Sequence, residues 1–139
     1  MPYEFNRTKL IEEEIKLGEE VITIKVNPFN IADKAISQYN KIKNTQNKID
    51  ELKLENNFNE LEKTVENLGN QVYNFFILLF EKEASDKIIS FYEGNYIEMI
   101  CEIFPFITNN LLVKISEAIK QKQQDTKLKY TNKKWYMNR

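Results

Sequence analysis

The chain has 139 residues, the length of one ordinary domain, and its 20 basic and 21 acidic residues leave a formal net charge of -1. This balance argues against a dedicated nucleic-acid binder, whose domain is normally strongly basic. Histidine is absent and Cys101 is the single cysteine, which excludes histidine-based catalysis, an internal disulfide and a zinc site of histidines or clustered thiolates.

The first predicted element is a β-hairpin over residues 10–26. Residues 19–26 alternate apolar and polar side chains with a period of two, which is typical of a half-buried strand, and residues 10–17 alternate less cleanly. Gly18 lies between them and accepts the positive φ of a tight turn. Because a lone hairpin is marginal in water, its apolar face must lie on another part of the fold.

Three acidic residues, Glu12, Glu13 and Glu14, lie in the first strand. A cation site would need their oxygens to converge, but neighbouring side chains of a strand point to opposite faces. We therefore interpret them as solvated charges of the hairpin.

Two antiparallel helices are predicted next. Asn30 is the expected N-cap of a helix over residues 31–56, and the asparagines at 56–57 mark the turn to a second helix. One continuous helix over residues 31–80 remains the alternative.

The second helix carries a stripe of seven apolar residues spaced by three and four. They are Phe58, Leu61, Val65, Leu68, Val72, Phe75 and Leu79. Such a stripe is more often the core side of a helix than a partner surface. Residues 75–80 are apolar nearly all round, so they must be covered on every side, by this fold or by a partner. At six residues, this run is far short of the roughly twenty of a membrane span.

Shorter helices are predicted to follow. Ser85 is the expected N-cap of one, residues 93–95 form a turn, and residues 96–104 resume a helix that Pro105 breaks or kinks. Its expected inner face holds Ile97, Ile100, Cys101 and Phe104. Cys101 on that apolar face, with no histidine to activate it, is interpreted as a core residue.

The last predicted helix spans residues 111–122, with Thr108 or Asn109 as its cap. Residues 125–139 hold five basic residues and one acidic residue, with little apolar periodicity, which predicts a flexible basic tail after a single domain over residues 1–124. The expected fold class is α+β, predominantly α, with the N-terminal hairpin followed by four or five helices. No enzyme activity, metal or cofactor is expected.

The region from residue 79 to residue 107 has a recognisable order of short motifs. It reads Leu79-Phe80-Glu81, Lys87-Ile88-Ile89, Tyr92-Glu93-Gly94-Asn95-Tyr96-Ile97-Glu98-Met99 and Phe104-Pro105. Together with the strand-rich start and the Lys-rich end, this order resembles the small tail assembly chaperones of phages and prophages of low-GC Gram-positive bacteria. The resemblance covers most of residues 10–125.

The resemblance implies a non-enzymatic protein of the bacterial host cytoplasm. It would bind the long, apolar, helical tape-measure protein before tail tube protein polymerises around it, with no nucleic acid or membrane as partner. The implied partner site is an apolar groove of Phe76, Phe80, Tyr92, Tyr96, Ile100, Phe104 and Phe106. Two other functions stay open: a structural virion component, such as a head–tail connector or minor tail protein, and a small helical adaptor or regulator. A homo-oligomer also stays open.

Overall fold

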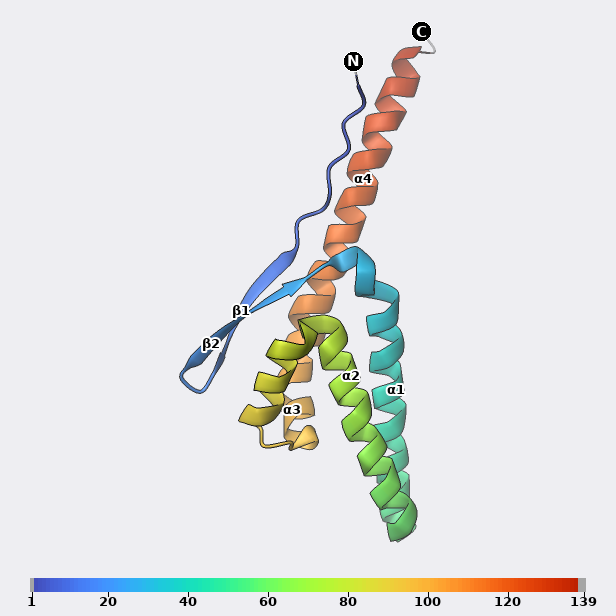
Figure 1. The fold of residues 1–139 in the computed structure, drawn as a ribbon. Coiled ribbons are helices and arrows are strands. Elements are labelled where there is room, and N and C mark those ends of the chain that lie inside the picture. Colours follow the sequence, from blue (N-terminus) through green and yellow to red (C-terminus); the bar gives the residue numbers. More distant parts are fainter. Residues whose placement is uncertain (1, 138–139) are drawn as a thin grey trace.

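The computed structural model describes the backbone of residues 2–137 and the side chains of residues 2–128. This part of the chain is a mostly helical α+β fold, in which a two-stranded antiparallel hairpin precedes three continuous helical runs (Figure 1). The elements are β1 Ile11–Leu17, β2 Glu20–Val26, α1 Pro28–Leu54, α2 Phe58–Phe91, α3 Tyr96–Phe106, a π-helix at Ile107–Leu111 and α4 Leu112–Met137. The last three elements form the third run. The predicted class is confirmed in outline, with fewer separate helices than expected.

The predicted hairpin is confirmed. β1 and β2 pair residue by residue up to Leu17 opposite Glu20. Gly18 opens the two-residue turn with φ 64°, and glycine at the first turn position is typical of a type II′ hairpin. The apolar side of β2 is buried against the helices, with Ile24 only 1% exposed.

The three consecutive glutamates do not converge, as the strand alternation predicts. Glu12 and Glu14 are exposed, whereas Glu13 lies on the inner face and pairs with Lys114 of α4. This ion pair joins the hairpin to the C-terminal helix.

Helix α1 begins three residues earlier than expected, and its N-cap is Asn27 rather than Asn30. The Asn27 side chain accepts a hydrogen bond from the Phe29 amide at 3.1 Å, and Pro28 occupies the first helical turn. Proline favours this position because its fixed φ is already helical and its missing N–H would have no helical partner. The predicted turn at residues 56–57 is confirmed, so α1 and α2 are two antiparallel helices side by side (Figure 1).

Ser85 does not begin a new helix, so that prediction was wrong. α2 continues across a kink at Glu81, whose backbone has φ 65° and ψ 173°. Ser85 is buried four residues later, and its hydroxyl donates to the Glu81 carbonyl at 2.6 Å instead of capping a helix. The Tyr73 hydroxyl donates to Asp86 at 3.2 Å and so joins the two halves of α2 across the kink.

The Glu81 backbone gives a testable prediction, because this region of φ and ψ is almost exclusive to glycine and costs other residues about 1–3 kcal/mol. We expect Glu81→Gly to raise the free energy of unfolding by about 1 kcal/mol in urea titrations. Glu83→Gly is the matched control, since Glu83 is exposed in helical backbone and its replacement should lower stability by about 1 kcal/mol. Equal losses in both variants would contradict a strained Glu81.

Pro105 does not end its helix either. α3 continues through Pro105 to Phe106, and the π-helix leads directly into α4. The Thr108 hydroxyl donates to the carbonyls of Phe104 at 3.1 Å and Pro105 at 3.4 Å. These bonds give the two carbonyl groups a partner where the π-helix interrupts the regular α-helical hydrogen bonds. Thr108 and Asn109 therefore lie inside the run, and the prediction that one of them caps the last helix was wrong.

The third run is longer than expected at its end. The backbone of α4 is helical to Met137, past the expected end near residue 122 and through most of the predicted tail, because no glycine or proline interrupts this stretch. By length and composition alone, Tyr96–Leu128 is apolar enough to cross a membrane, with 39% of the window buried inside the fold. A core helix passes the same test, and inward residues of this run belong to the core: Met99, Ile103, Ile107 and Leu111.

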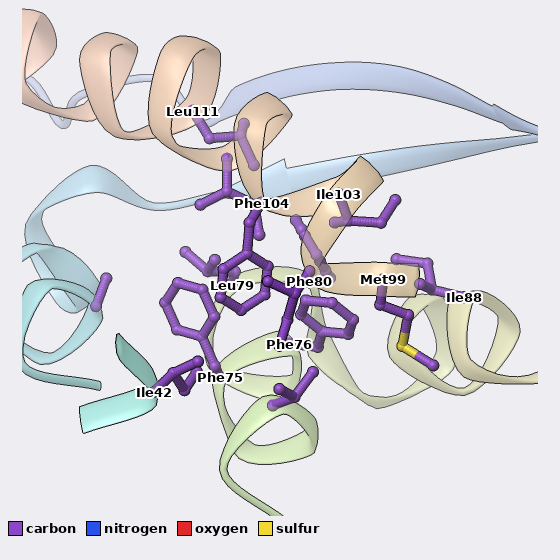
Figure 2. Packing of buried hydrophobic residues seen from close by; sticks show 14 of the residues in the cluster. Ile42, Phe75, Phe76, Leu79, Phe80, Ile88, Met99, Ile103, Phe104 and Leu111 are labelled. Atoms are coloured by element: carbon purple, nitrogen blue, oxygen red, sulfur yellow. The ribbon is translucent and has the colours of Figure 1, made fainter. Parts of the chain in front are cut away.

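The core is centred on aromatic rings where α1, α2 and α3 meet (Figure 2). The Phe104 ring lies 5.5 Å from that of Phe75, 6.1 Å from that of Phe76 and 6.0 Å from that of Tyr39, measured between centroids. All three phenylalanines are 3% exposed or less.

The inner face of α3 differs from the predicted one. Ile100 and Phe104 are buried as expected, but Ile97 is 52% exposed and Cys101 is exposed, so the assignment of Cys101 to the core was wrong. Apolar residues lie on more than one side of α3. The side that holds Met99 and Ile103 is the one that packs against the rest of the fold and is buried.

Candidate functional site

The seven residues of the expected groove are brought together, but mostly inside the protein. Phe76, Phe80, Tyr92, Ile100 and Phe104 are buried, and Tyr96 and Phe106 are half-buried. α2 packs against α1, β2 and α3 of the same chain, so its apolar segment at residues 75–80 is mostly covered, with Ile77 and Leu78 half-buried. An open groove of these residues is therefore not formed, which corrects the expectation.

Tyr96 covers a glycine instead of lining a groove. A Cβ atom added to Gly69 of α2 would lie 2.6 Å from Cε2 of the Tyr96 ring, far inside van der Waals contact. The close approach of α3 to α2 thus depends on the missing side chain at residue 69.

Tyr92 is a buried polar anchor between the end of α2 and α3. It is 7% exposed, and its hydroxyl donates to Oε2 of Glu102 at 2.6 Å. Burial, and then the hydrogen bond to the Glu102 carboxylate, raise the pKa of Tyr92 well above its ordinary value.

This raised pKa predicts a loss of stability at alkaline pH. The unfolded tyrosine ionises near pH 10, so the stabilisation is complete below about pH 10 and is lost as the pH rises toward the folded pKa. We expect the free energy of unfolding to fall from about pH 10 upward, and to fall less steeply in Tyr92→Phe. Urea titrations of both proteins at a series of pH values measure the difference in slope. Identical slopes would contradict a buried, protonated Tyr92.

Exposed apolar side chains gather at the far end of the α1–α2 pair. Leu54 is 85% exposed, Phe58 is 68% exposed and Val65 is 42% exposed, and Leu61 between them is half-buried. We call these four residues the hairpin-end patch, after the helical hairpin that α1 and α2 form; the name does not refer to the β-hairpin. Figure 1 shows that this end of α1 and α2 points away from the β-hairpin and α4. The last four members of the predicted stripe are buried, so only its first part is left open.

The sequence analysis did not predict this patch: it interpreted the stripe that holds three of the four residues as the core side of α2, and it did not single out Leu54. Phe58, Leu61 and Val65 belong to the regular stripe, whereas Leu54 lies outside the apolar spacing of α1. Its position beside the turn was the one available signal, because apolar residues at a helix end have few neighbours of their own chain to cover them.

A second surface feature is a groove between β2 and the kinked part of α2. It has a volume of about 300 Å³ and is lined by Val21, Ile22, Thr23, Lys25, Phe80, Glu81, Glu83, Ala84 and Lys87. Near it, the Lys87 ammonium lies 3.0 Å from a Glu20 carboxylate oxygen, and this hydrogen-bonded charge raises the pKa of Lys87.

Within the described side chains, no group of three or more cysteines and acids is placed to hold a metal ion. Most side chains of the predicted basic tail, those of residues 129–139, lie outside the described part. Comparisons with protein-family models, curated proteins and solved structures gave no match.

Proposed function

We propose that this protein is a non-enzymatic tail assembly chaperone of a phage or prophage, which binds the apolar helical tape-measure protein in the host cytoplasm. The proposal is supported by the resemblance over residues 10–125. It depends most on the hairpin-end patch, which is apolar surface that the chain leaves open to water.

The patch has the spacing that suits a helical partner. Phe58, Leu61 and Val65 are separated by three and four residues, so they form one stripe over the first turns of α2. Leu54, the last residue of α1, adds a further exposed apolar side chain next to the turn. An amphipathic helix would lay its apolar side along such a surface, with anchors at the same spacing. The seven residues of the expected groove then act as the support of the binding helices, not as the binding surface.

Co-expression tests the proposal. We expect a gene for a long helical protein directly downstream of the gene for this chain. When the two proteins are co-expressed, the long protein should stay soluble and co-purify with this chain. Phe58→Asp with Val65→Asp should abolish the complex, because two charges would be buried against an apolar helix. Ile36→Asp with Val113→Asp is the matched control, since both residues are about half exposed and lie on α1 and α4 outside the patch.

An insoluble long protein, or a complex that the patch variant retains, would contradict the proposal. Mass spectrometry of purified particles separates it from a structural virion component. A displaced chaperone should be missing from the particles, whereas a connector or minor tail protein would be present.

A further inference from the structure

The outer edge of β2 has backbone groups without a strand partner. In a hairpin with a two-residue turn, the closing pair Leu17–Glu20 is hydrogen bonded, and such pairs then recur at every second residue. Val21, Thr23 and Lys25 therefore direct their N–H and C=O groups away from β1. Among the described residues the sheet has only two strands, so no third strand meets these groups.

The groove described above runs along this edge. Val21, Thr23 and Lys25 line one side, and residues of α2 between Phe80 and Lys87 line the other. The edge is therefore bordered by α2 but not covered by it. At its turn end, the hairpin stays in contact with the last turns of α2, where Gly18 lies beside the Phe91 ring and Glu20 pairs with Lys87.

We propose that a second copy of this chain pairs with this edge, so that the two β2 strands lie antiparallel about a two-fold axis at Thr23. The two hairpins would then form one four-stranded sheet. This pairing is independent of the tape-measure proposal, because it uses the opposite end of the fold from the hairpin-end patch.

The sequence of β2 is complementary to itself in this register. Thr23 lies opposite the partner's Thr23, which is a favourable cross-strand pair. Ile22 lies opposite the partner's Ile24, so the apolar inner face continues across the interface. Lys25 lies opposite the partner's Val21 and diagonal to the partner's Glu19, within reach of an opposite charge.

The same operation on the other edge is unfavourable, which is why we assign the interface to β2. Glu14 lies opposite Thr23 in the hairpin, so it is the corresponding central residue of β1. A two-fold axis there would place Glu14 against the partner's Glu14, and like charges directly opposite each other destabilise a strand pair. Glu12 would face the partner's Lys16, but on the inner face the charged Glu13 would face the apolar Ile15, whereas the β2 pairing has neither a like-charge pair nor a charge on its apolar face.

Sedimentation of the full chain over a range of concentrations tests the dimer. The wild-type chain should associate to a dimer, and Thr23→Pro should raise the dissociation constant at least about tenfold by removing an outward N–H. Glu14→Pro is the matched control, because it removes an outward N–H from the other edge and should leave the constant unchanged. Circular dichroism establishes that each variant is folded. A chain that stays monomeric, or a dimer that Thr23→Pro leaves intact, would overturn the proposal.

Cross-linking tests the register. In a chain with Cys101→Ser, Thr23→Cys should form a disulfide-linked dimer, because facing Cα atoms of a strand pair are about 5.5 Å apart. Val21→Cys alone should not cross-link, since its two copies would lie four residues apart along the paired strands, but it should cross-link with Lys25→Cys in a mixture. Self-linking of Val21→Cys at the rate of Thr23→Cys, or no linking of Thr23→Cys, overturns the register.

Discussion

Phe104→Ala is expected to lower the free energy of unfolding by about 3–5 kcal/mol. The Phe104 side chain is 3% exposed, and its ring touches the aromatic cluster of Phe75, Phe76 and Tyr39. Truncation removes that buried apolar surface and leaves a cavity that rigid helices from three parts of the chain cannot close. Because domains are stable by only about 5–15 kcal/mol, the variant should unfold at much lower urea concentration.

Phe58→Ala is the control for this prediction. Phe58 is 68% exposed at the start of α2, so its truncation should change stability by less than about 0.5 kcal/mol. The two variants together distinguish a residue that supports the fold from one that binds the partner. Phe104→Ala should fail to fold well, whereas Phe58→Ala should fold and bind its partner helix less tightly. A Phe104→Ala protein as stable as the wild type would instead favour the groove expected from the resemblance.

The second large effect is expected at Gly69. Gly69→Leu should lower the free energy of unfolding by about 1–3 kcal/mol, because its side chain must occupy the space of the Tyr96 ring. Gly69→Ala should cost less, since alanine gains about 1 kcal/mol of helix propensity against the same close contact.

A double-mutant cycle identifies Tyr96 as the cause. Tyr96→Ala alone removes a half-buried ring and should destabilise the protein, but in the Gly69→Leu background it should recover part of the loss. Thermal or urea unfolding of the four proteins gives the coupling energy. Strictly additive losses would show that the larger side chain at position 69 is accommodated without disturbing Tyr96.

Turn chemistry was the most predictable part of the fold. Gly18, the asparagine pair at 56–57 and the turn at 93–95 were all found from the sequence, because positive φ and side-chain capping depend on local residues. The alternation of apolar and polar residues in β2 predicted the hairpin because this pattern is also a local property of the sequence.

Helix interruptions were less predictable. Ser85 and Pro105 are residues that often begin or end helices, yet both lie inside helical runs, while the real kink falls at Glu81, which has no breaking tendency of its own. Their surroundings decide this outcome: the hydroxyls of Ser85 and Thr108 find carbonyl partners in the preceding turn, and the packed core holds the helices together.

By itself, the sequence determined a mostly helical chain with one N-terminal hairpin, since hydrophobic period and turn residues act over a few positions. Only the tertiary structure decided which apolar residues are covered. Phe76, Phe80 and Phe104 are sealed by segments far away in the chain, whereas Leu54 and Phe58, no less apolar, stay in water at the end of a helix pair. Burial depends on long-range packing of whole elements, and no local pattern records which elements meet.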